Sequence, residues 1–262
     1  MLARGICLMR VLVACEYSGV VRDAFLAIGH EAMSCDLLPT EAPGPHYQGD
    51  VRHVLRGWMP VQYTADCDPD GDGWYRVWNT CTDSCFCPGP TQEDEMEYRE
   101  IDGVLFARPI ERPFWDLMIA HPPCTYLSVS GMHWTKRGLR DPQLTEDALD
   151  FVRLLLNAPI ESIALENPVS VISSRIRKPD QIINPWQYGH DASKKTCLWL
   201  KNLPPLQPTE IIEPRIVNGR KRWGNQCDSG QNKLGPSEDR WKIRSATYPG
   251  IANAMANQWG CL

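Results

Sequence analysis

The sequence predicts an α/β fold with a mainly parallel β-sheet flanked by helices. Short apolar runs alternate with amphipathic stretches along the chain, a pattern typical of strands joined by helical crossovers. The 262 residues are enough for one sizeable core, and 43% hydrophobic and 23% charged residues are ordinary for a globular protein. We therefore expect residues 1–262 to form a single domain.

The N-terminal part alternates strand and helix. MRVLVACEYSG contains a short strand that ends in small residues, and VVRDAFLAIGHEA carries Val21, Phe25 and Ile28 at helical spacing. AMSCDLL is interpreted as a second strand, and the stretch from YQGDV as a short third strand at the edge. The sheet is expected to begin with these three strands.

Residues 62–110 interrupt this pattern. The segment is rich in Asp, Gly, Cys and Pro and shows neither helical nor strand periodicity, so we interpret it as an acidic, cysteine-rich insertion. Cys67, Cys81, Cys85 and Cys87 could supply four thiolates to a structural zinc ion, although their spacing lacks the paired Cys-x2-Cys of most zinc sites. Zinc and metal-free thiols both stay open.

Regular patterning returns after the insertion. WDLMIAHPPC is interpreted as strand and loop, LTEDALDFVRLLLNA as a helix capped near Thr145, and SIALENP as strand and loop. KTCLWLKNL predicts another strand, residues 201–244 a loop-rich basic segment, and residues 245–262 a closing helix within YPGIANAMANQWG. No apolar run approaches the ~20 residues of a membrane span, and the eleven cysteines favour reduced thiols. We expect a soluble cytoplasmic protein without a membrane partner.

Charge is strongly segregated along the chain. Residues 66–103 carry eleven acidic against two basic residues, a net −9, whereas residues 194–244 carry eleven basic against five acidic residues, a net +6. Because the local field at a binding face decides what it attracts, the overall charge of −5 does not exclude a nucleic-acid partner. The basic segment is the predicted surface for phosphate groups.

Four short polar motifs directly follow apolar strands, namely ACEYSG, SCDLL, HPPC and LENP. In open parallel sheets, ligands bind at the carboxyl ends of the strands, so these motifs are expected to meet. Pro122 and Pro123 stiffen the loop that holds Cys124, because proline fixes φ and restricts the preceding residue. A fixed thiol near the carboxylate of Glu166 suits nucleophilic attack on a ring carbon. The alternative for Cys124 is a small buried hydrophobic residue.

These motifs resemble those of the DNA cytosine-5 methyltransferases, in particular the short members encoded by bacteriophages, and the resemblance covers most of the chain. ACEYSG resembles the family's cofactor-binding loop, HPPC its Pro-Cys nucleophile loop, and LENP its Glu-Asn loop, with proline replacing the usual valine. The resemblance implies a Rossmann-like fold that uses S-adenosylmethionine to methylate C5 of cytosine in double-stranded DNA. Cys124 would add to C6 of a flipped base while Glu166 holds ring N3.

The resemblance and the basic patches together give the candidate site residues. The catalytic candidates are Cys124, Glu166, Pro123, Asn167 and Lys194. The cofactor-binding candidates are Cys15, Glu16, Tyr17, Ser18, Gly19, Asp36, Leu37, Asp50, Val51, Pro122 and Asn253, with a cap or turn as the alternative role of Asp36 and Asp50. The DNA-binding candidates are Lys194, Lys195, Arg215, Arg220, Lys221, Arg222, Arg240, Lys242 and Arg244, interleaved with Trp223 and Trp241.

Three rival functions stand beside this one. A methyltransferase acting on an exocyclic amino group needs an aromatic residue where Cys124 stands. A catalytically silent or regulatory DNA-binding protein of the same fold would have no need of Cys124 and Glu166 together. A relative that installs another one-carbon group at C5 shares the thiolate step, and the sequence does not separate it. We expect a monomer on DNA, and the resemblance suggests protection of phage DNA from restriction.

Overall fold

The computed structural model describes residues 8–60, 96–101, 103–109 and 114–261. A seven-stranded sheet in the order β3-β2-β1-β7-β8-β10-β9 forms its centre. The strands are β1 (Arg10–Ala14), β2 (Glu31–Asp36), β3 (His46–Gln48), β7 (Leu117–Ala120), β8 (Ser162–Pro168), β9 (Gln181–Ile183) and β10 (Thr196–Lys201). The first five strands in this order run parallel, and β10 is antiparallel to both of its neighbours. The prediction of a Rossmann-like α/β fold with a mainly parallel sheet is confirmed.

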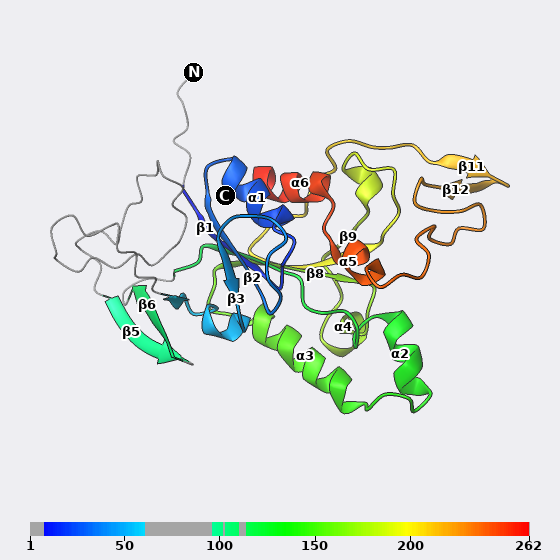
Figure 1. Cartoon of the computed structure of the whole chain (residues 1–262). Coiled ribbons are helices and arrows are strands. Elements are labelled where there is room, and N and C mark those ends of the chain that lie inside the picture. The colour runs from blue at the N-terminus through cyan, green and yellow to red at the C-terminus, as the bar shows by residue number, and fades with distance from the viewer. Residues whose placement is uncertain (1–7, 61–95, 102, 110–113, 262) are drawn as a thin grey trace, which may run out of the picture.

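Helices cover both faces of the sheet (Figure 1). Helices α1 (Val20–Ala27) and α6 (Pro249–Trp259) lie on one face, and α3 (Gln143–Leu156) lies on the other. The side chains of β1 alternate accordingly, because Val11 and Val13 belong to the core under α1 and α6, whereas Leu12 belongs to the core under α3. The central strands are buried on both faces, which explains why their residues form continuous apolar runs in the sequence.

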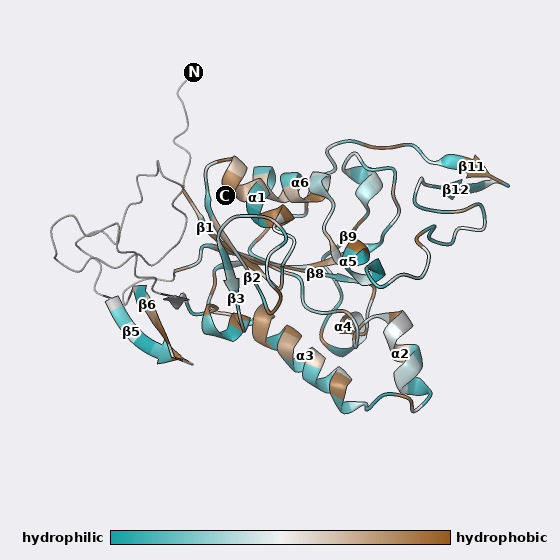
Figure 2. Ribbon diagram, viewed as in Figure 1, coloured by the Kyte–Doolittle hydropathy of each residue, from teal (hydrophilic) through white to brown (hydrophobic). Residues whose placement is uncertain are grey.

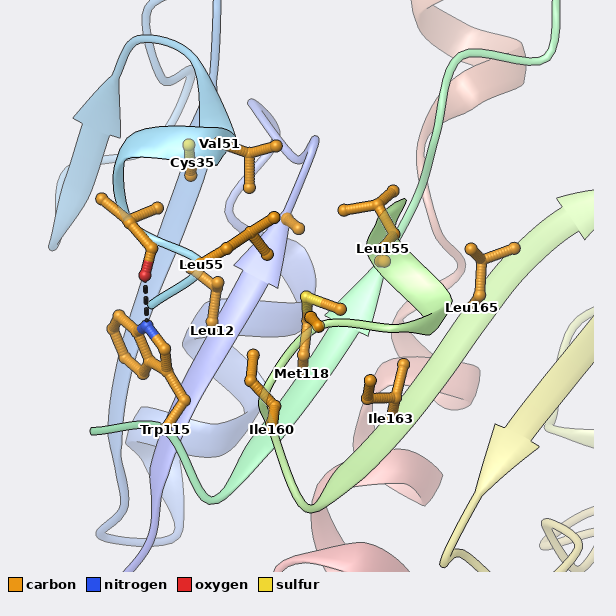
Figure 3. Packing of buried hydrophobic residues seen from close by; sticks show 14 of the residues in the cluster. Leu12, Cys35, Val51, Leu55, Trp115, Met118, Leu155, Ile160, Ile163 and Leu165 are labelled. Carbon is orange, nitrogen blue, oxygen red and sulfur yellow. Dashed lines mark hydrogen bonds between the residues drawn. The ribbon is translucent and has the colours of Figure 1, made fainter. Parts of the chain in front are cut away.

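The core under α3 joins strands, helix and loop (Figure 3). Leu12, Met118 and Leu165 come from β1, β7 and β8, and they pack beside Leu155 of α3. Trp115 is 1% exposed, and its indole N–H donates to the carbonyl of Val54 at 2.8 Å. This bond satisfies a buried donor and attaches the segment after β3 to the start of β7.

The chain leaves β1 for β2 and β3 on one side, and returns to place β7 and β8 on the other side of β1. The switch in direction therefore falls between β1 and β7. The loops after these two strands diverge from that point, which is where open α/β sheets form ligand-binding crevices. This topology directs attention to Cys15–Gly19 and to the loop that begins at His121.

The expectation of no strand structure in residues 62–110 was wrong for the end of that segment. Strands β5 (Met96–Ile101) and β6 (Val104–Pro109) form an antiparallel hairpin, and β6 also pairs with β4 (Met59–Pro60). Strand β5 carries charged residues along its exposed length, which hides the period of two on which sequence reasoning depends. The four cysteines of the zinc hypothesis lie outside the described residues.

Two further expectations need correction. Helix α3 begins at Gln143 after Pro142, and Thr145 is a buried residue within the helix whose hydroxyl donates to the carbonyl of Tyr126 at 3.2 Å, so it is not the cap. Helix α2 (Val129–Lys136) was not predicted. Its apolar residues Val129 and Trp134 are 64% and 46% exposed. The helix therefore lacks the buried apolar stripe from which most helices are predicted in a sequence.

The basic segment 201–244 is loop-rich, as predicted, but it also folds locally. Strands β11 (Arg215–Val217) and β12 (Arg220–Arg222) form a hairpin, and α5 (Arg240–Ser245) follows. The turn residues Asn218 and Gly219 have φ of 50° and 72°, the left-handed pair that suits a two-residue hairpin turn. The hairpin projects from the body of the protein, and its ribbon is mostly hydrophilic (Figures 1 and 2). Between Leu206 and Ile251 no hydrophobic side chain belongs to the buried core.

The remaining short elements are α4 (Ile172–Arg175), η1 (Val51–His53) and η3 (Pro185–Gln187). None of the helices in the described part of the chain has the length and apolar character needed to cross a bilayer.

Candidate active site

The loop after β7 is joined to the ends of β1 and β8. The expectation that LENP forms a loop was wrong, because pairing with β10 keeps Glu166–Pro168 within strand β8. The backbone N–H of His121 donates to the carbonyl of Ala14 at 2.9 Å, which extends the pairing of β7 with β1 by one residue. The side-chain amide of Asn167, which is 1% exposed, donates to the carbonyl of Pro122 at 2.8 Å. The loop that holds Cys124 is therefore fixed from both sides, and Asn167 acts within the protein rather than on its surface.

Cys124 stands on a turn between β7 and α2. Its carbonyl accepts the N–H groups of Leu127 at 3.1 Å and Ser128 at 2.8 Å, and the hydroxyl of Ser128 then caps α2 by accepting from Gly131 at 3.2 Å. Pro122 is buried and Pro123 is exposed, as is Cys124 itself. The thiol is thus accessible, unlike the buried thiols of Cys35 and Cys197.

The carboxylate of Glu166 lies in a largely enclosed polar setting. Its Oε2 atom is 3.0 Å from Nδ1 of His121, and the two side chains are 13% and 12% exposed. Burial by itself raises the pKa of Glu166, but the hydrogen bond from His121 and the positive charge of Lys194 outweigh burial and hold the pKa below its usual value. Glu166 is consequently ionised at neutral pH.

The thiol of Cys124 is influenced by the same groups. Partial burial and the negative charge of Glu166 raise the pKa of Cys124, while the positive charges of Lys194 and Arg244 oppose this rise. These four side chains therefore share one electrostatic neighbourhood. In the free protein at neutral pH, the thiol keeps its proton while the carboxylate has lost its own.

A second group of side chains gathers beside the ends of β1 and β2. Cys15 adopts a left-handed φ of 60°, and burial together with the charges of Asp36 and Asp50 raises its pKa to about 12. Leu37, directly after Asp36, is an apolar side chain left 73% exposed. The structure thus brings Cys15, Asp36 and Asp50 together, as the sequence predicted.

Asp50 and Val51 also have roles in the fold. Asp50 caps η1 by accepting from the N–H of Arg52 at 2.9 Å, and its other oxygen pairs with the Arg52 guanidinium at 2.7 Å. Asp36 accepts from the N–H of Leu38 at 2.9 Å and so closes a turn. Val51 is 5% exposed and packs in the core under α3, which leaves only its backbone for any ligand.

The loop from Cys15 to Gly19 is built around Glu16. This side chain is 5% exposed, and its carboxylate accepts from the N–H groups of Val21 at 2.8 Å and Arg22 at 3.2 Å and from the hydroxyl of Ser18 at 3.2 Å. Glu16 therefore neutralises the first turn of α1 instead of facing a ligand. Gly19 has a φ of 75°, and a Cβ there would lie 2.4 Å from the Arg22 guanidinium.

Helix α5 links the two groups of side chains. The Tyr17 hydroxyl lies 2.9 Å from that of Ser245, and its ring packs on Trp241 with a centroid separation of 5.9 Å. Beside Ser245, at the C-terminal end of the helix, the Lys194 ammonium donates to the carbonyl of Arg244 at 2.8 Å. A cation is favourable there because helix carbonyls point toward it. Lys194 thus has a structural partner while its charge acts on Cys124 and Glu166.

The other candidate DNA contacts divide into two sets. Arg215 pairs with Asp228 at 2.5 Å, and Arg222 donates to backbone carbonyls of residues 228 and 229, so both brace the hairpin. Lys195, Arg220 and Lys221 are exposed. Within the described part of the chain, no side-chain hydrogen bond or ion pair involves them. Arg240 and Lys242 are half-buried and Arg244 is exposed on α5.

The last cofactor candidate, Asn253, lies on the closing helix. Asn253 is exposed on α6, on the side opposite the buried residues Ile251, Ala252 and Met255. The helix itself forms where it was expected, and its packing on α1 accounts for the apolar pattern that made the segment recognisable.

Sequence reasoning missed two features. His121 was placed in the HPPC loop motif without a role of its own, although it is the residue that contacts Glu166. Exposed cations also follow Cys124 on and after α2, namely Lys136 and Arg137, while Arg140 donates to the carbonyl of Thr125 at 3.1 Å. The signal for the second feature was the basic cluster K-R-G-L-R in the sequence.

Comparison with known proteins adds little. No family model and no curated protein sequence matches the chain. Among solved structures, an E. coli protein described as a DNA modification methyltransferase encoded within a prophage matches with 12% identity and a TM-score of 0.37. The match covers 78% of this chain and 52% of that structure, so this chain spans about half of its length. A similarity this weak leaves any function to be argued from the site.

Proposed function

We propose that the protein is a DNA cytosine-5 methyltransferase that uses S-adenosylmethionine and Cys124 as the covalent nucleophile. One observation carries the proposal. An accessible thiol on a fixed loop shares its electrostatic neighbourhood with an ionised carboxylate, next to the switch point of an α/β sheet. Nucleophile, proton carrier and predicted cofactor loop thus come from adjacent strand ends.

The residues present suit addition to a pyrimidine ring. As the sulfur of Cys124 bonds to C6, the thiol proton leaves, the C5–C6 electron pair forms a C4–C5 double bond, and the C4–N3 electron pair moves onto N3. Glu166 is ionised and Cys124 protonated in the free protein, so the proton that N3 needs is already within the site, and Glu166 can carry it. After C5 has taken the methyl group, N3 returns its proton to Glu166, a base removes the C5 proton, and the C5–C6 double bond forms again as the thiolate leaves.

The group beside Asp36 fits an adenosyl cofactor. The free carboxylate oxygen of Asp36 at the end of β2 suits ribose hydroxyls, and the exposed Leu37 offers an apolar surface to a purine ring. S-adenosylmethionine would supply an electrophilic methyl group there. Cys15–Gly19 would form the opposite wall, with Tyr17 connecting that wall to α5.

Two of the rivals fit the site less well. Transfer to an exocyclic amino group has no use for the accessible thiol of Cys124. A silent DNA-binding protein has no use for a fixed Cys124 loop next to an ionised Glu166. The test is to incubate the purified protein with methyl-labelled cofactor and DNA, and to sequence DNA from expressing cells after bisulfite treatment. We expect label at cytosine C5 in a defined sequence context, and unlabelled DNA would contradict the proposal.

Replacing Glu166 by glutamine should change Cys124 in a definite direction. Removing the negative charge takes away one cause of the raised thiol pKa, so alkylation of Cys124 by iodoacetamide should reach its half-maximal rate at a lower pH. Lys194→Gln should shift the profile to higher pH. Methyl transfer by Glu166→Gln should still fall by about 10²-fold or more, because the proton carrier is lost. Peptide mass spectrometry measures the alkylation of Cys124 as a function of pH. If the profiles of Glu166→Gln and Lys194→Gln shifted in the same direction, the opposite effects of these two charges on the thiol would be contradicted.

The exposed cations of the hairpin should contact DNA phosphates. We expect Arg220→Gln with Lys221→Gln to weaken DNA binding and to lower the slope of log K against log salt by about 0.9 for each lost contact. Arg153→Gln on α3, which removes a partly exposed cation paired with Asp150 and distant in sequence from the hairpin, serves as the control. Fluorescence anisotropy at several salt concentrations measures the slopes, and equal slopes in both variants and wild type would exclude the hairpin as a phosphate-binding element.

A further inference from the structure

The bond between His121 and Glu166 joins two side chains from neighbouring parallel strands. His121 directly follows β7 and is fixed by its backbone bond to Ala14, while Glu166 belongs to β8. Their contact is 3.0 Å from Nδ1 to Oε2, and both side chains are largely buried. Nothing in the proposed chemistry so far requires a histidine there.

The surroundings define which ring nitrogen carries the proton. Nε2 of His121 is buried and has no hydrogen-bond partner within the described part of the chain. A buried N–H without an acceptor is costlier than a lone pair without a donor, so the proton belongs on Nδ1, where the carboxylate accepts it. His121 thus donates to Glu166 through Nδ1. Oε2 is thereby engaged by His121, and the Thr196 hydroxyl is a further side-chain hydrogen-bond partner of the Glu166 carboxylate.

We infer that His121 is a positioning residue that holds the Glu166 carboxylate in place as an ionised acceptor and thereby restricts the site to pyrimidines with an amino group at C4. This inference rests on the proposed function and deepens it. An ionised carboxylate accepts a hydrogen bond from the amino group of cytosine. It repels the C4 carbonyl of uracil or thymine, which would need a donor.

Other groups also act on Glu166, and they set the pH dependence. Lys194 approaches from the segment before β10, Thr196 and Cys197 lie on β10, and Cys124 lies on the loop after β7. Loss of the His121 bond removes the strongest of the influences that favour the ionised carboxylate. Glu166 would then take up a proton at a higher pH and could donate to a C4 carbonyl.

Two nearly isosteric substitutions separate this role from a merely structural one. In His121→Asn, the amide nitrogen can replace Nδ1 as the donor, whereas His121→Leu fills a similar volume without any donor. The probes are DNA duplexes with randomised flanks that carry one 5-fluorocytosine or one 5-fluorouracil, incubated with S-adenosylmethionine. Covalent adduct formation is measured from pH 5 to 9 on denaturing gels.

We expect wild type to prefer the 5-fluorocytosine duplex by at least about 100-fold, because a site built to bind an N–H rejects a ring that lacks it. His121→Asn should keep this preference within about threefold. His121→Leu should reduce it at least tenfold, most strongly toward pH 5. Comparing variants on the same two probes cancels the intrinsic difference in reactivity of the two rings.

The adduct measurements distinguish failure of the His121 role from failure of the proposed function. Equal preferences in His121→Leu and His121→Asn, with adducts still formed, would overturn the role of His121 and leave the proposed function standing. No adduct from wild type on either probe would overturn the proposed function and the inference with it. Should His121→Leu fail to fold, His121→Gln takes its place, because its longer side chain carries the amide beyond Oε2. Unchanged preference there would equally overturn the inference.

Discussion

We expect Cys124→Ser to lower methyl transfer to DNA by at least about 10⁴-fold while leaving the fold intact. The hydroxyl of serine does not ionise appreciably at neutral pH and is a far weaker nucleophile toward C6 than a thiolate. The exchange replaces one sulfur atom by a smaller oxygen atom at an exposed position, so no cavity forms. Filter binding with labelled cofactor measures the activity, and thermal unfolding monitors the fold.

The control for this experiment is Cys227→Ser. Cys227 also lies near the surface, and its hydrogen bond with Ser229 lowers the pKa of the thiol, which makes it the better nucleophile toward simple reagents. We expect this variant to methylate DNA and to form an adduct with 5-fluorocytosine like the wild type. Methylation that survives in Cys124→Ser would point instead to transfer onto an amino group, which needs no thiol.

Arg22→Leu should destabilise the protein by about 3 kcal/mol or more, as expected when a buried, fully bonded charged group is removed. Its side chain is completely buried, and its guanidinium donates to Asp23, Ser34 and Thr40 and to the carbonyls of residues 42 and 43. Without it, several acceptors between α1 and the loop after β2 lose their partner. Denaturant unfolding measures the loss, and weaker cofactor binding should accompany it because that loop follows Asp36.

Arg153→Leu provides the comparison. Arg153 also pairs with an acid, Asp150 at 2.6 Å, but the side chains are 41% and 72% exposed. Surface ion pairs contribute about 1 kcal/mol or less, so this variant should unfold close to wild type. A similarly small effect of Arg22→Leu would mean that water replaces the guanidinium in its site.

The sheet could be predicted from the sequence because its central strands are buried on both faces. The runs around Leu12, Ile119 and Leu165 are continuous and apolar, and each ends in a polar motif. Strand β5 and helix α2 could not be predicted in this way. Their exposed surfaces carry charged and apolar residues without a period, since neither element buries a face against the sheet.

The candidate site was only partly predictable, for a different reason. Strand ends located Cys124, Glu166, Asp36 and Asp50, because topology alone brings such residues to one edge. The sequence could not show which side chains the fold itself uses. Glu16 caps α1, and Arg215 braces the hairpin, although each belongs to a motif that suggested a ligand contact. Whether a polar group is already satisfied depends on neighbours that are distant in sequence.

The stretch between Leu206 and Ile251 gives no hydrophobic residue to the buried core, yet it carries the hairpin and α5. It is attached at its base by the stacked rings of Trp186 and Trp223 and by reciprocal bonds between Asn225 and Ser193. Within this stretch, the hairpin can be exchanged without removing the contacts that α5 makes with Tyr17 and Lys194. Variation or grafting at the tip around Asn218 would leave the folding of the rest of the molecule unaffected, so new target preferences could evolve here at little thermodynamic cost.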